Sequence, residues 1–249
     1  LVLVALTYYF RRERHGDDIM PALDPEYTPR VSIIIAAYNE SDHIAETIRG
    51  LLAIDYPNYE IVIIDDGSTD GSAAMLDACA AREPRVRVIH LPHQGKDVTL
   101  WRAVAEVHSE WLCVMDSDGQ YDPEDIPRLI MLAETLEADA VWGVRTARED
   151  NTLRTLSSAV GRLARRLIIG EPVVRDAGCG LIVARHSFYA RATAACPHPA
   201  GQVHCHLAEL ITAQGGKVDE LSISHRRRPG GHAKFGMCNR ILPGLRSLL

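Results

Sequence analysis

Three aspartates stand close together in residues 113–123, which read CVMDSDGQYDP. They are Asp116, Asp118 and Asp122, and they follow an apolar run with the composition of a buried strand. Carboxylates gathered in one place repel one another unless a cation or hydrogen-bond donors offset their charge. In an extended backbone Asp116 and Asp118 point the same way, and Gln120 adds a neutral oxygen. Such oxygens suit Mg²⁺ or Mn²⁺, so the stretch predicts a divalent metal site, although a polar turn has the same composition.

A second polar stretch, DDGSTDGS at residues 65–72, follows the apolar run IVII. Aspartate, glycine and serine are typical of an Asx-type turn that leads into a helix. The same side chains offer carboxylates to the N–H groups of a nucleobase and hydroxyls to a ribose. Gly95 and Lys96 lack the preceding glycine of a Walker A loop, and no G-x-G-x-x-G follows the first apolar run. A turn and a nucleotide site both remain open here, and a dinucleotide-binding fold is disfavoured.

Five short apolar or β-branched runs predict the strands of a covered parallel sheet, at residues 31–37, 60–65, 86–91, 111–115 and 140–143. Helical spacing fills the gaps, with Ser41 as the expected N-cap of one helix and Asp122 followed by Pro123 as the expected start of another. The alternation predicts a single α/β domain with a mostly parallel open sheet flanked by helices. Ligands of such sheets bind outside the carboxyl ends of the strands, where the acidic residues would converge.

The composition limits the classes of function. The chain has 249 residues, of which 47% are hydrophobic and 24% are charged, as in a soluble globular protein. Its formal net charge of −6 argues against a general nucleic-acid binder. The six cysteines include no C-x-x-C pair, which suits free thiols in a reducing compartment.

Two segments raise the question of a membrane. Residues 1–10, LVLVALTYYF, are apolar and precede Arg11, Arg12 and Arg14. A bilayer core of about 30 Å needs roughly 20 helical residues, so this run is either the tail of a longer span with its arginines on the cytoplasmic side or a short buried element. Residues 153–169 place leucines at helical spacing among arginines, which fits a helix on an anionic lipid surface and equally a helix packed on the sheet.

Six segments occur in the order found in family 2 glycosyltransferases of the GT-A fold, and the chain resembles that family over roughly residues 30–240. The segments are AAYNE, IVIIDDGSTDGS, GKDVTLWRAV, DSDGQYDPEDI, RDAGCGL and HRRRPGGHAKFG. Within the family the chain looks most like the dolichol-phosphate mannosyltransferase group and its bacterial polyprenyl-phosphate relatives. The resemblance implies a Rossmann-like catalytic domain at residues 30–236, between an N-terminal apolar and basic segment (1–29) and an amphipathic or juxtamembrane segment (237–249).

The resemblance also implies roles for individual residues. The nucleotide would be bound by Ala36, Tyr38, Glu40, Asp66, Lys96 and Asp116. The metal, Mg²⁺ or Mn²⁺, would be held against the diphosphate by Asp116, Asp118 and Gln120. The acceptor phosphate would meet Arg145 and Arg228. The catalytic residues would be Asp116, Asp118, Arg228 and Lys234, the last two from a basic loop that closes over the site. The sequence departs from the family's usual residues at Ala36, Cys205 and Ala233.

The implied reaction is the metal-dependent transfer, with inversion, of one sugar from a UDP- or GDP-sugar to a polyprenyl (dolichyl or undecaprenyl) phosphate. It would take place at the cytoplasmic face of the membrane, with the protein peripheral or anchored there. A metal at the two aspartates, together with Arg228 or Lys234, would stabilise the charge that develops on the leaving diphosphate. A lipid phosphate is already an anionic nucleophile, whereas a hydroxyl acceptor would need a base, for which Asp176 is the candidate.

Three other functions stay open. The first is a glycosyltransferase with a hydroxyl acceptor on a polysaccharide or lipid. The second is a phosphatase of the haloacid-dehalogenase type, in which a D-x-D-G loop normally follows the first strand, whereas here it follows the fourth predicted strand. The third is a sugar-nucleotide-binding module without turnover, which only an assay distinguishes from an enzyme.

Overall fold

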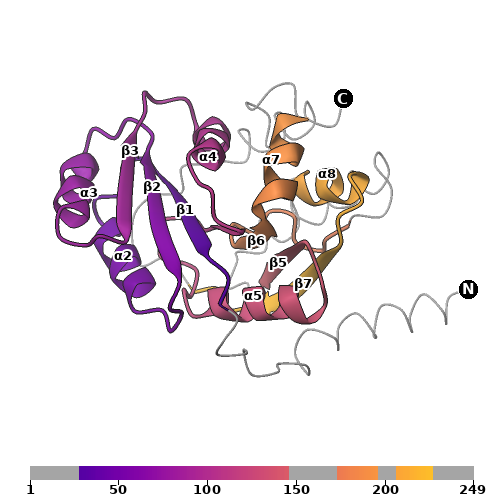
Figure 1. Cartoon of the computed structure of the whole chain (residues 1–249). Helices are drawn as coiled ribbons and strands as arrows, with labels where there is room; N and C mark the ends of the chain where they lie inside the picture. Colours follow the sequence, from indigo (N-terminus) through magenta and orange to yellow (C-terminus); the bar gives the residue numbers. More distant parts are fainter. Residues whose placement is uncertain (1–27, 146–172, 196–205, 227–249) are drawn as a thin grey trace, which may run out of the picture.

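The computed structural model describes residues 28–145, 173–195 and 206–226. In these ranges seven strands form one sheet in the order β3-β2-β1-β4-β6-β5-β7 (Figure 1). All neighbouring strands are parallel except β6, which runs antiparallel to β4 and β5. The single α/β domain with a mostly parallel open sheet is therefore confirmed. The strands are β1 (Val31–Ala37), β2 (Tyr59–Asp65), β3 (Val86–His90), β4 (Trp111–Val114), β5 (Ala140–Arg145), β6 (Ile182–Arg185) and β7 (Val218–Ile223).

Helices cover both faces of the sheet (Figure 1). They are α2 (Ile44–Leu52), α3 (Ser72–Ala80), α4 (Lys96–Ala105), α5 (Asp125–Thr135), α7 (His186–Ala194) and α8 (Leu207–Ala213). Successive residues of β1 alternate between the faces, so Ile33 and Ile35 join the core formed with α2 and α5, while Ile34 joins the core formed with α4. Because both faces are buried, the central strands read as continuous apolar runs.

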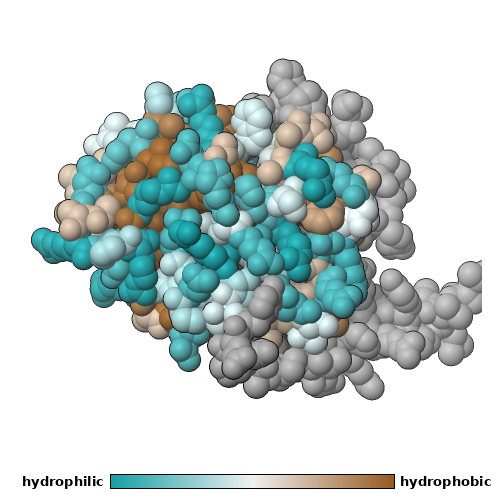
Figure 2. All heavy atoms as spheres, viewed as in Figure 1, coloured by the Kyte–Doolittle hydropathy of each residue, from teal (hydrophilic) through white to brown (hydrophobic). Residues whose placement is uncertain are grey.

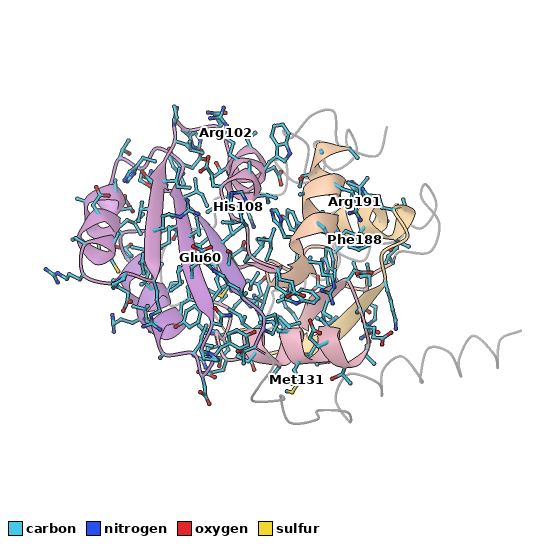
Figure 3. The ribbon with its side chains drawn as sticks, viewed as in Figure 1. Glu60, Arg102, His108, Met131, Phe188 and Arg191 are labelled. Carbon is cyan, nitrogen blue, oxygen red and sulfur yellow. The ribbon has the colours of Figure 1, made fainter. Side chains whose placement is uncertain are left out.

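The two ends of the sheet differ in their surface. At the β5 and β7 end, α7 packs on α8, and the Arg191 guanidinium lies 4.3 Å from the centroid of the Phe188 ring (Figure 3). At the other end, Figure 2 shows an apolar area over β2 and β3 beside α4, where Ile64, Ile89 and Leu91 line a hollow. Trp101 of α4 is 40% exposed.

The predicted strands differ from the observed ones only at their ends, but two strands were missed. The bounds of β1 are those predicted, and the other four strands differ by one or two residues. No strand was predicted for β6, which is only four residues long and leads directly into α7. None was predicted for β7 because Asp219 and Glu220 interrupt its apolar pattern. Glu220 is nevertheless buried, and Arg175 pairs with its carboxylate at 2.9 Å.

Both predicted N-caps stand two residues before the observed ones, which are His43 for α2 and Glu124 for α5. Helix α2 begins at Ile44, and the backbone N–H of Ser41 instead donates to Asp70 Oδ2 at 3.0 Å. Helix α5 begins at Asp125, after a turn in which the N–H of Asp125 donates to the carbonyl of Asp122 at 3.1 Å. The backbone of Ser41 is thus used by a neighbouring loop, whereas the Asp122 side chain accepts from the N–H of Glu124 at 3.3 Å, as an N-cap does, within the turn that precedes α5.

Within the three ranges described above, no helix is long and apolar enough to cross a membrane. The membrane-related expectations concern residues 1–29, 153–169 and 237–249, and all of these except residues 28 and 29 lie outside those ranges.

Candidate active site at the carboxyl edge of the sheet

The turn after β4 carries Asp116 and Asp118 and is held by two neighbouring elements. Thr47 Oγ1 of α2 donates to the carbonyl of Ser117 at 3.1 Å, and Ser117 Oγ donates to the carbonyl of Ala36 in β1 at 3.2 Å. The Asp118 side chain accepts from the backbone N–H of Gln120 at 3.2 Å. Asp118 is buried and Asp116 is partly exposed. The turn therefore presents the Asp116 carboxylate at the carboxyl edge of the sheet, as the sequence predicts.

A lysine of the same chain offsets the charge of this turn. Lys96, the first residue of α4, forms an ion pair with Asp116 through its Nζ and Asp116 Oδ1. Burial lowers the pKa of Lys96, but the charge and hydrogen bond of Asp116 outweigh burial and leave that pKa raised. The Lys96 ammonium group of α4 thus offsets the repulsion predicted among the carboxylates, and these carboxylates in turn stabilise its positive charge.

The donor set fits a hard divalent ion. No group of three or more His, Cys, Asp or Glu side chains that could hold a metal occurs among the residues that the structure describes. Mg²⁺ needs no such group, since one or two carboxylates together with substrate phosphates and waters usually bind it. Asp116 and Asp118 supply two carboxylates from one turn, and the Lys96 ammonium shows that Asp116 attracts a cation there. These residues fit Mg²⁺ or Mn²⁺.

Asp66 organises the loop that leads into α4. Its Oδ1 accepts from the N–H of Gln94 and from Thr99 Oγ1, both at 2.8 Å, and its Oδ2 accepts from the N–H of Gly95 at 2.9 Å. His93 Nδ1 lies 2.9 Å from the same Oδ2. The side chain is 2% exposed. Asp66 thereby fixes the start of α4, and with it the backbone that carries Lys96.

The loop after β1 lies along the loop after β2. The N–H of Asn39 donates to Ser68 Oγ at 3.0 Å, and the N–H of Thr69 donates to Asn39 Oδ1 at 2.8 Å. The N–H of Ser68 donates to Asp65 Oδ1 at 3.0 Å, which is the Asx-type turn that the sequence suggests. The Tyr38 ring stacks on the His93 ring with a centroid distance of 4.0 Å. Tyr38, in the loop after β1, and Asp66, after β2, are both expected to contact the nucleotide. The two loops that carry them are therefore neighbours.

Hydrogen bonds also fix Glu40 and Asp70 in these loops. The backbone N–H of Glu40 donates to Ser72 Oγ at 3.0 Å, and Ser72 Oγ donates to Asp70 Oδ1 at 2.6 Å. Burial raises the pKa of Asp70, but the hydrogen bonds from Ser72 and Ser41 outweigh it and leave that pKa well below its usual range. The network fixes the loop that carries Glu40 before any ligand binds.

Arg145 and Asp176 form a bidentate pair near this edge. Arg145 Nε lies 2.7 Å from Asp176 Oδ2, and Arg145 Nη2 lies 2.7 Å from Asp176 Oδ1. Burial lowers the pKa of Arg145, but the hydrogen bonds and charge of Asp176 outweigh burial and leave that pKa raised. Both Asp176 oxygens face a guanidinium, which is an arrangement that orients Arg145 and leaves Asp176 poorly suited to accept a proton.

The start of the predicted basic loop is attached to the D-x-D-x-Q stretch. The N–H of Arg226 donates to the carbonyl of Gln120 at 2.7 Å, and Gln120 Nε2 donates to the carbonyl of Arg226 at 3.2 Å. The Arg226 guanidinium pairs with Asp122. The chain therefore enters the basic segment beside the predicted metal ligands. Arg228 and Lys234, to which the sequence assigns the closing role, lie outside the described residues.

Tyr121 and Gly180 belong to this site but were not among the site residues predicted from the sequence. Tyr121 and Gly180 are hydrogen-bonded to each other, and the Asp116 carboxylate packs against Gly180. Tyr121 stands in DSDGQYDP and Gly180 in RDAGCGL, so both lie in segments that carry the family resemblance. Neighbouring Cys179 is a free thiol, as are Cys79 and Cys113, in agreement with the expectation from composition.

Comparison with known proteins agrees with this geometry. The model of glycosyl transferase family 2 matches residues 32–190. An undecaprenyl-phosphate 4-deoxy-4-formamido-L-arabinose transferase of Shewanella sediminis is 32% identical over 224 residues, which cover 85% of this chain and 63% of that protein. The enzyme of the same name from Yersinia enterocolitica is 28% identical over 230 residues, covering 88% of this chain and 66% of that protein. The chain thus spans less than two thirds of the length of these relatives.

Solved structures agree on the fold. A mannosyltransferase from Pyrobaculum calidifontis, in complex with GDP-Man and Mn²⁺, has a TM-score of 0.66 at 21% identity, covering 92% of this chain and 65% of that one. Glucosyl-3-phosphoglycerate synthase from Mycobacterium tuberculosis, in complex with Mn²⁺, UDP and glucosyl-3-phosphoglycerate, has a TM-score of 0.57 at 21% identity, covering 81% and 73%. The chain has the GT-A fold of these structures and belongs to glycosyl transferase family 2.

Proposed function

We propose that this protein is a metal-dependent, inverting glycosyltransferase that moves one sugar from a nucleotide-diphosphate sugar to a polyprenyl phosphate. The observation that carries the proposal is the Asp116 carboxylate, paired with Lys96 at the carboxyl edge of the sheet, in a chain of glycosyl transferase family 2. The relatives named above are transferases to undecaprenyl phosphate, which supports a polyprenyl phosphate as the acceptor.

The donor nucleotide binds along the loops that follow β1 and β2. Ala36, Tyr38 and Glu40 line the pocket, and the stacked rings of Tyr38 and His93 offer an aromatic surface beside it. Asp66 acts on this pocket through the loop at residues 93–95, because both of its oxygens already accept hydrogen bonds from the chain. The donor is a UDP- or GDP-sugar.

The diphosphate of the donor lies at Asp116, where Asp118 and Gln120 complete the expected metal ligands. A divalent ion bound by these residues supplies electrostatic stabilisation of the leaving group. Lys96 stands at the same carboxylate and is placed to bind a phosphate oxygen of the donor. Arg228 and Lys234, from the basic segment that begins beside Gln120, add positive charge as the bond to the sugar breaks. The role of these residues is to hold charge rather than to form a covalent bond.

The acceptor phosphate binds at Arg145. Asp176 holds the Arg145 guanidinium in a fixed orientation, which lowers the free-energy cost of ordering that guanidinium around a phosphate. A phosphate oxygen attacks the anomeric carbon without a dedicated base, since it is already anionic near neutral pH. The bidentate pair favours this acceptor over a hydroxyl, because Asp176 would have to leave Arg145 to take a proton. A lipid acceptor places the reaction at a membrane surface, and we propose the cytoplasmic face.

A binding and turnover experiment tests the proposal. UDP- and GDP-sugars are screened by thermal shift with and without Mn²⁺ or Mg²⁺, because a ligand that binds only the native state raises its apparent stability. Transfer of the sugar is then measured to undecaprenyl phosphate and, as the alternative, to undecaprenol. We expect a metal-dependent shift with one nucleotide and transfer to the phosphate only. Binding without transfer to either lipid would identify a non-catalytic module.

Variants of the turn after β4 identify the site. Asp116→Asn and Asp118→Asn should abolish the metal-dependent part of the thermal shift without loss of the fold, since each removes one carboxylate charge. Asp55→Asn is the matched control, because Asp55 is exposed and lies between α2 and β2, before the amino end of that strand. Unchanged metal dependence of turnover in both turn variants would remove these aspartates from the site.

A further inference from the structure

Asp116 lies directly on the backbone of Gly180. A Cβ atom added at Gly180 would stand 2.2 Å from Asp116 Oδ2 and 2.7 Å from Asp116 Oδ1. Both distances are far below any real contact of a Cβ atom, so the carboxylate occupies the space that a side chain at position 180 would fill. The backbone of Gly180 is not in the left-handed region, unlike that of Gly119 or Gly95. The need for glycine here is therefore one of space and not of backbone conformation.

The segment that carries Asp116 also holds Gly180 from a second side. The N–H of Gly180 donates to the Tyr121 hydroxyl oxygen at 2.7 Å, and Tyr121 is 5% exposed. The Tyr121 ring makes an edge contact with His225, at 5.2 Å between centroids, and the two residues form an isolated β-bridge. Tyr121 is thus fixed by the strand end that precedes the basic segment, and it fixes Gly180 under the carboxylate.

The loop that contains Gly180 also contains the partner of Arg145. The N–H of Cys179 donates to the carbonyl of Asp176 at 2.9 Å, which closes a tight turn between them. Gly178 lies in the same turn, and a Cβ atom added there would stand 3.6 Å from Arg145 Nη2. Only three residues therefore separate Asp176, which orients the proposed phosphate-binding arginine, from Gly180, which supports the proposed metal ligand.

Two contacts thus act on different oxygens of Asp116. Lys96 pairs with Oδ1, whereas Oδ2 is the oxygen closest to Gly180. An aspartate rotates about two side-chain bonds, and one ion pair leaves part of that freedom. Close packing against a bare Cα removes orientations that the ion pair allows. The carboxylate consequently keeps its place when a metal ion competes with Lys96 for it.

We propose that Gly180 and Tyr121 are positioning residues for the metal site: Gly180 provides the surface on which the Asp116 carboxylate rests, and the Tyr121 hydroxyl holds that surface in place. This inference rests on the proposed function, since it assumes that Asp116 binds a divalent ion. It assigns to the RDAGCGL segment a role on the donor side of the reaction, in addition to the Asp176 contact with Arg145.

Mn²⁺ titration tests the inference without an activity assay. The dissociation constant of Mn²⁺ is measured by calorimetry in the presence of saturating nucleotide diphosphate for the parent, Gly180→Ala and Gly178→Ala. The two variants add the same methyl group to one turn, but only the first displaces Asp116. We expect Gly180→Ala to weaken Mn²⁺ binding at least tenfold and Gly178→Ala to change it less than twofold. Equal affinity in the parent and Gly180→Ala would overturn the inference.

Tyr121→Phe provides the second arm, in case Gly180→Ala does not fold. Loss of the hydroxyl leaves the N–H of Gly180 without its acceptor but adds no atom, and thermal unfolding verifies the fold. We expect Mn²⁺ affinity to fall several-fold and turnover to recover at high Mn²⁺, as a positioning role requires. Mn²⁺ affinity equal to that of the parent would overturn the role of Tyr121. If the parent itself binds no Mn²⁺, the proposed metal site fails together with this inference, which distinguishes that failure from a failure of the Gly180 contact alone.

Discussion

Lys96 and Asp116 form an ion pair that joins the first residue of α4 to the turn after β4. A metal ion at the same carboxylate would have to take the place of the ammonium group. The pair therefore opposes metal binding before the donor arrives, whereas a donor phosphate gives the ammonium a new partner. Metal and nucleotide are expected to bind together for this reason.

Replacing Lys96 separates its effect on metal binding from its effect on nucleotide binding. In Lys96→Met the carboxylate no longer has a competing cation, so Mn²⁺ alone should bind about tenfold more tightly or better, since loss of a like charge at this range is worth at least about 1.4 kcal/mol. The affinity for the nucleotide sugar should fall, because Lys96 no longer reaches its phosphates. Calorimetric titrations with each ligand measure both changes. Lys217→Met, which removes an exposed lysine whose ammonium bonds to the carbonyl of Leu136, is the control. Mn²⁺ affinity that stays equal or falls in Lys96→Met would contradict the competition.

Variants of Arg145 and Asp176 distinguish two possible roles of Asp176, which are to orient Arg145 and to accept a proton from the acceptor. Arg145→Lys keeps the charge but loses the two-point contact, so the KM for undecaprenyl phosphate should rise about tenfold while donor affinity stays unchanged. Asp176→Asn should raise the same KM and lower the free energy of unfolding by about 1–3 kcal/mol, because it weakens hydrogen bonds to a charged, partly buried guanidinium. Steady-state kinetics and urea unfolding give these values. If Asp176 were a base, its variant would lose kcat at every acceptor concentration instead.

Most of the sheet could be predicted from the sequence because its strands are local patterns. Continuous runs such as Val31–Ala37 indicate strands buried on both faces, and the alternation with helices fixes a parallel sheet. The convergence of Asp66 and Asp116 at one edge follows from that topology alone. The two missed strands, β6 and β7, have either too few residues or too many charges to give such a pattern.

The contacts within the site could not be predicted, because they join residues far apart in the chain. The Tyr121 hydroxyl reaches the N–H of Gly180 across 59 residues, and Asp66 accepts from Gln94 across 28. Spacing along the sequence determines which side chains share a strand face or a helix turn, but not which distant backbone groups a carboxylate meets. The role of Asp66 in fixing the start of α4 is visible only once the loop at residues 93–95 is in place.

The contacts of His90 should make the stability of the folded protein depend on pH. Its Nδ1 lies 3.0 Å from Asp65 Oδ2 and its Nε2 lies 2.9 Å from Asp77 Oδ1, and these hydrogen bonds raise the pKa of His90 against a smaller effect of burial. A raised pKa in the folded state means that the protonated ring stabilises the protein fully below about pH 6.5, and that this stability is lost as the pH rises through the folded-state pKa. Since the ring is 43% exposed, we expect an effect of about 1 kcal/mol or less.

The comparison with His90→Gln measures this effect. The difference in the free energy of unfolding between parent and variant should be largest at pH 6 and should shrink toward pH 9. Urea unfolding at several pH values gives the two curves, and His108→Gln controls for loss of a histidine that makes neither contact. A difference that stays constant with pH would show that His90 contributes through its neutral form only.

A substitution at Gly143 of β5 should crowd the core, and a second substitution at Ile223 should relieve that crowding. A Cβ atom added there would stand 2.5 Å from Ile223 Cδ1 and 3.1 Å from Cys179 Sγ, so Gly143→Ala should cost about 1–3 kcal/mol of stability, as overpacking of a core does. Ile223→Val removes the closest atom and should by itself cost about 0.5–1.5 kcal/mol. Because the new methyl group then fills the space left by Cδ1, the double variant should lose less stability than the sum of the two single losses. Urea unfolding of all four proteins measures this coupling. Additive losses would mean that strain at Cys179, rather than at Ile223, limits the residue at position 143.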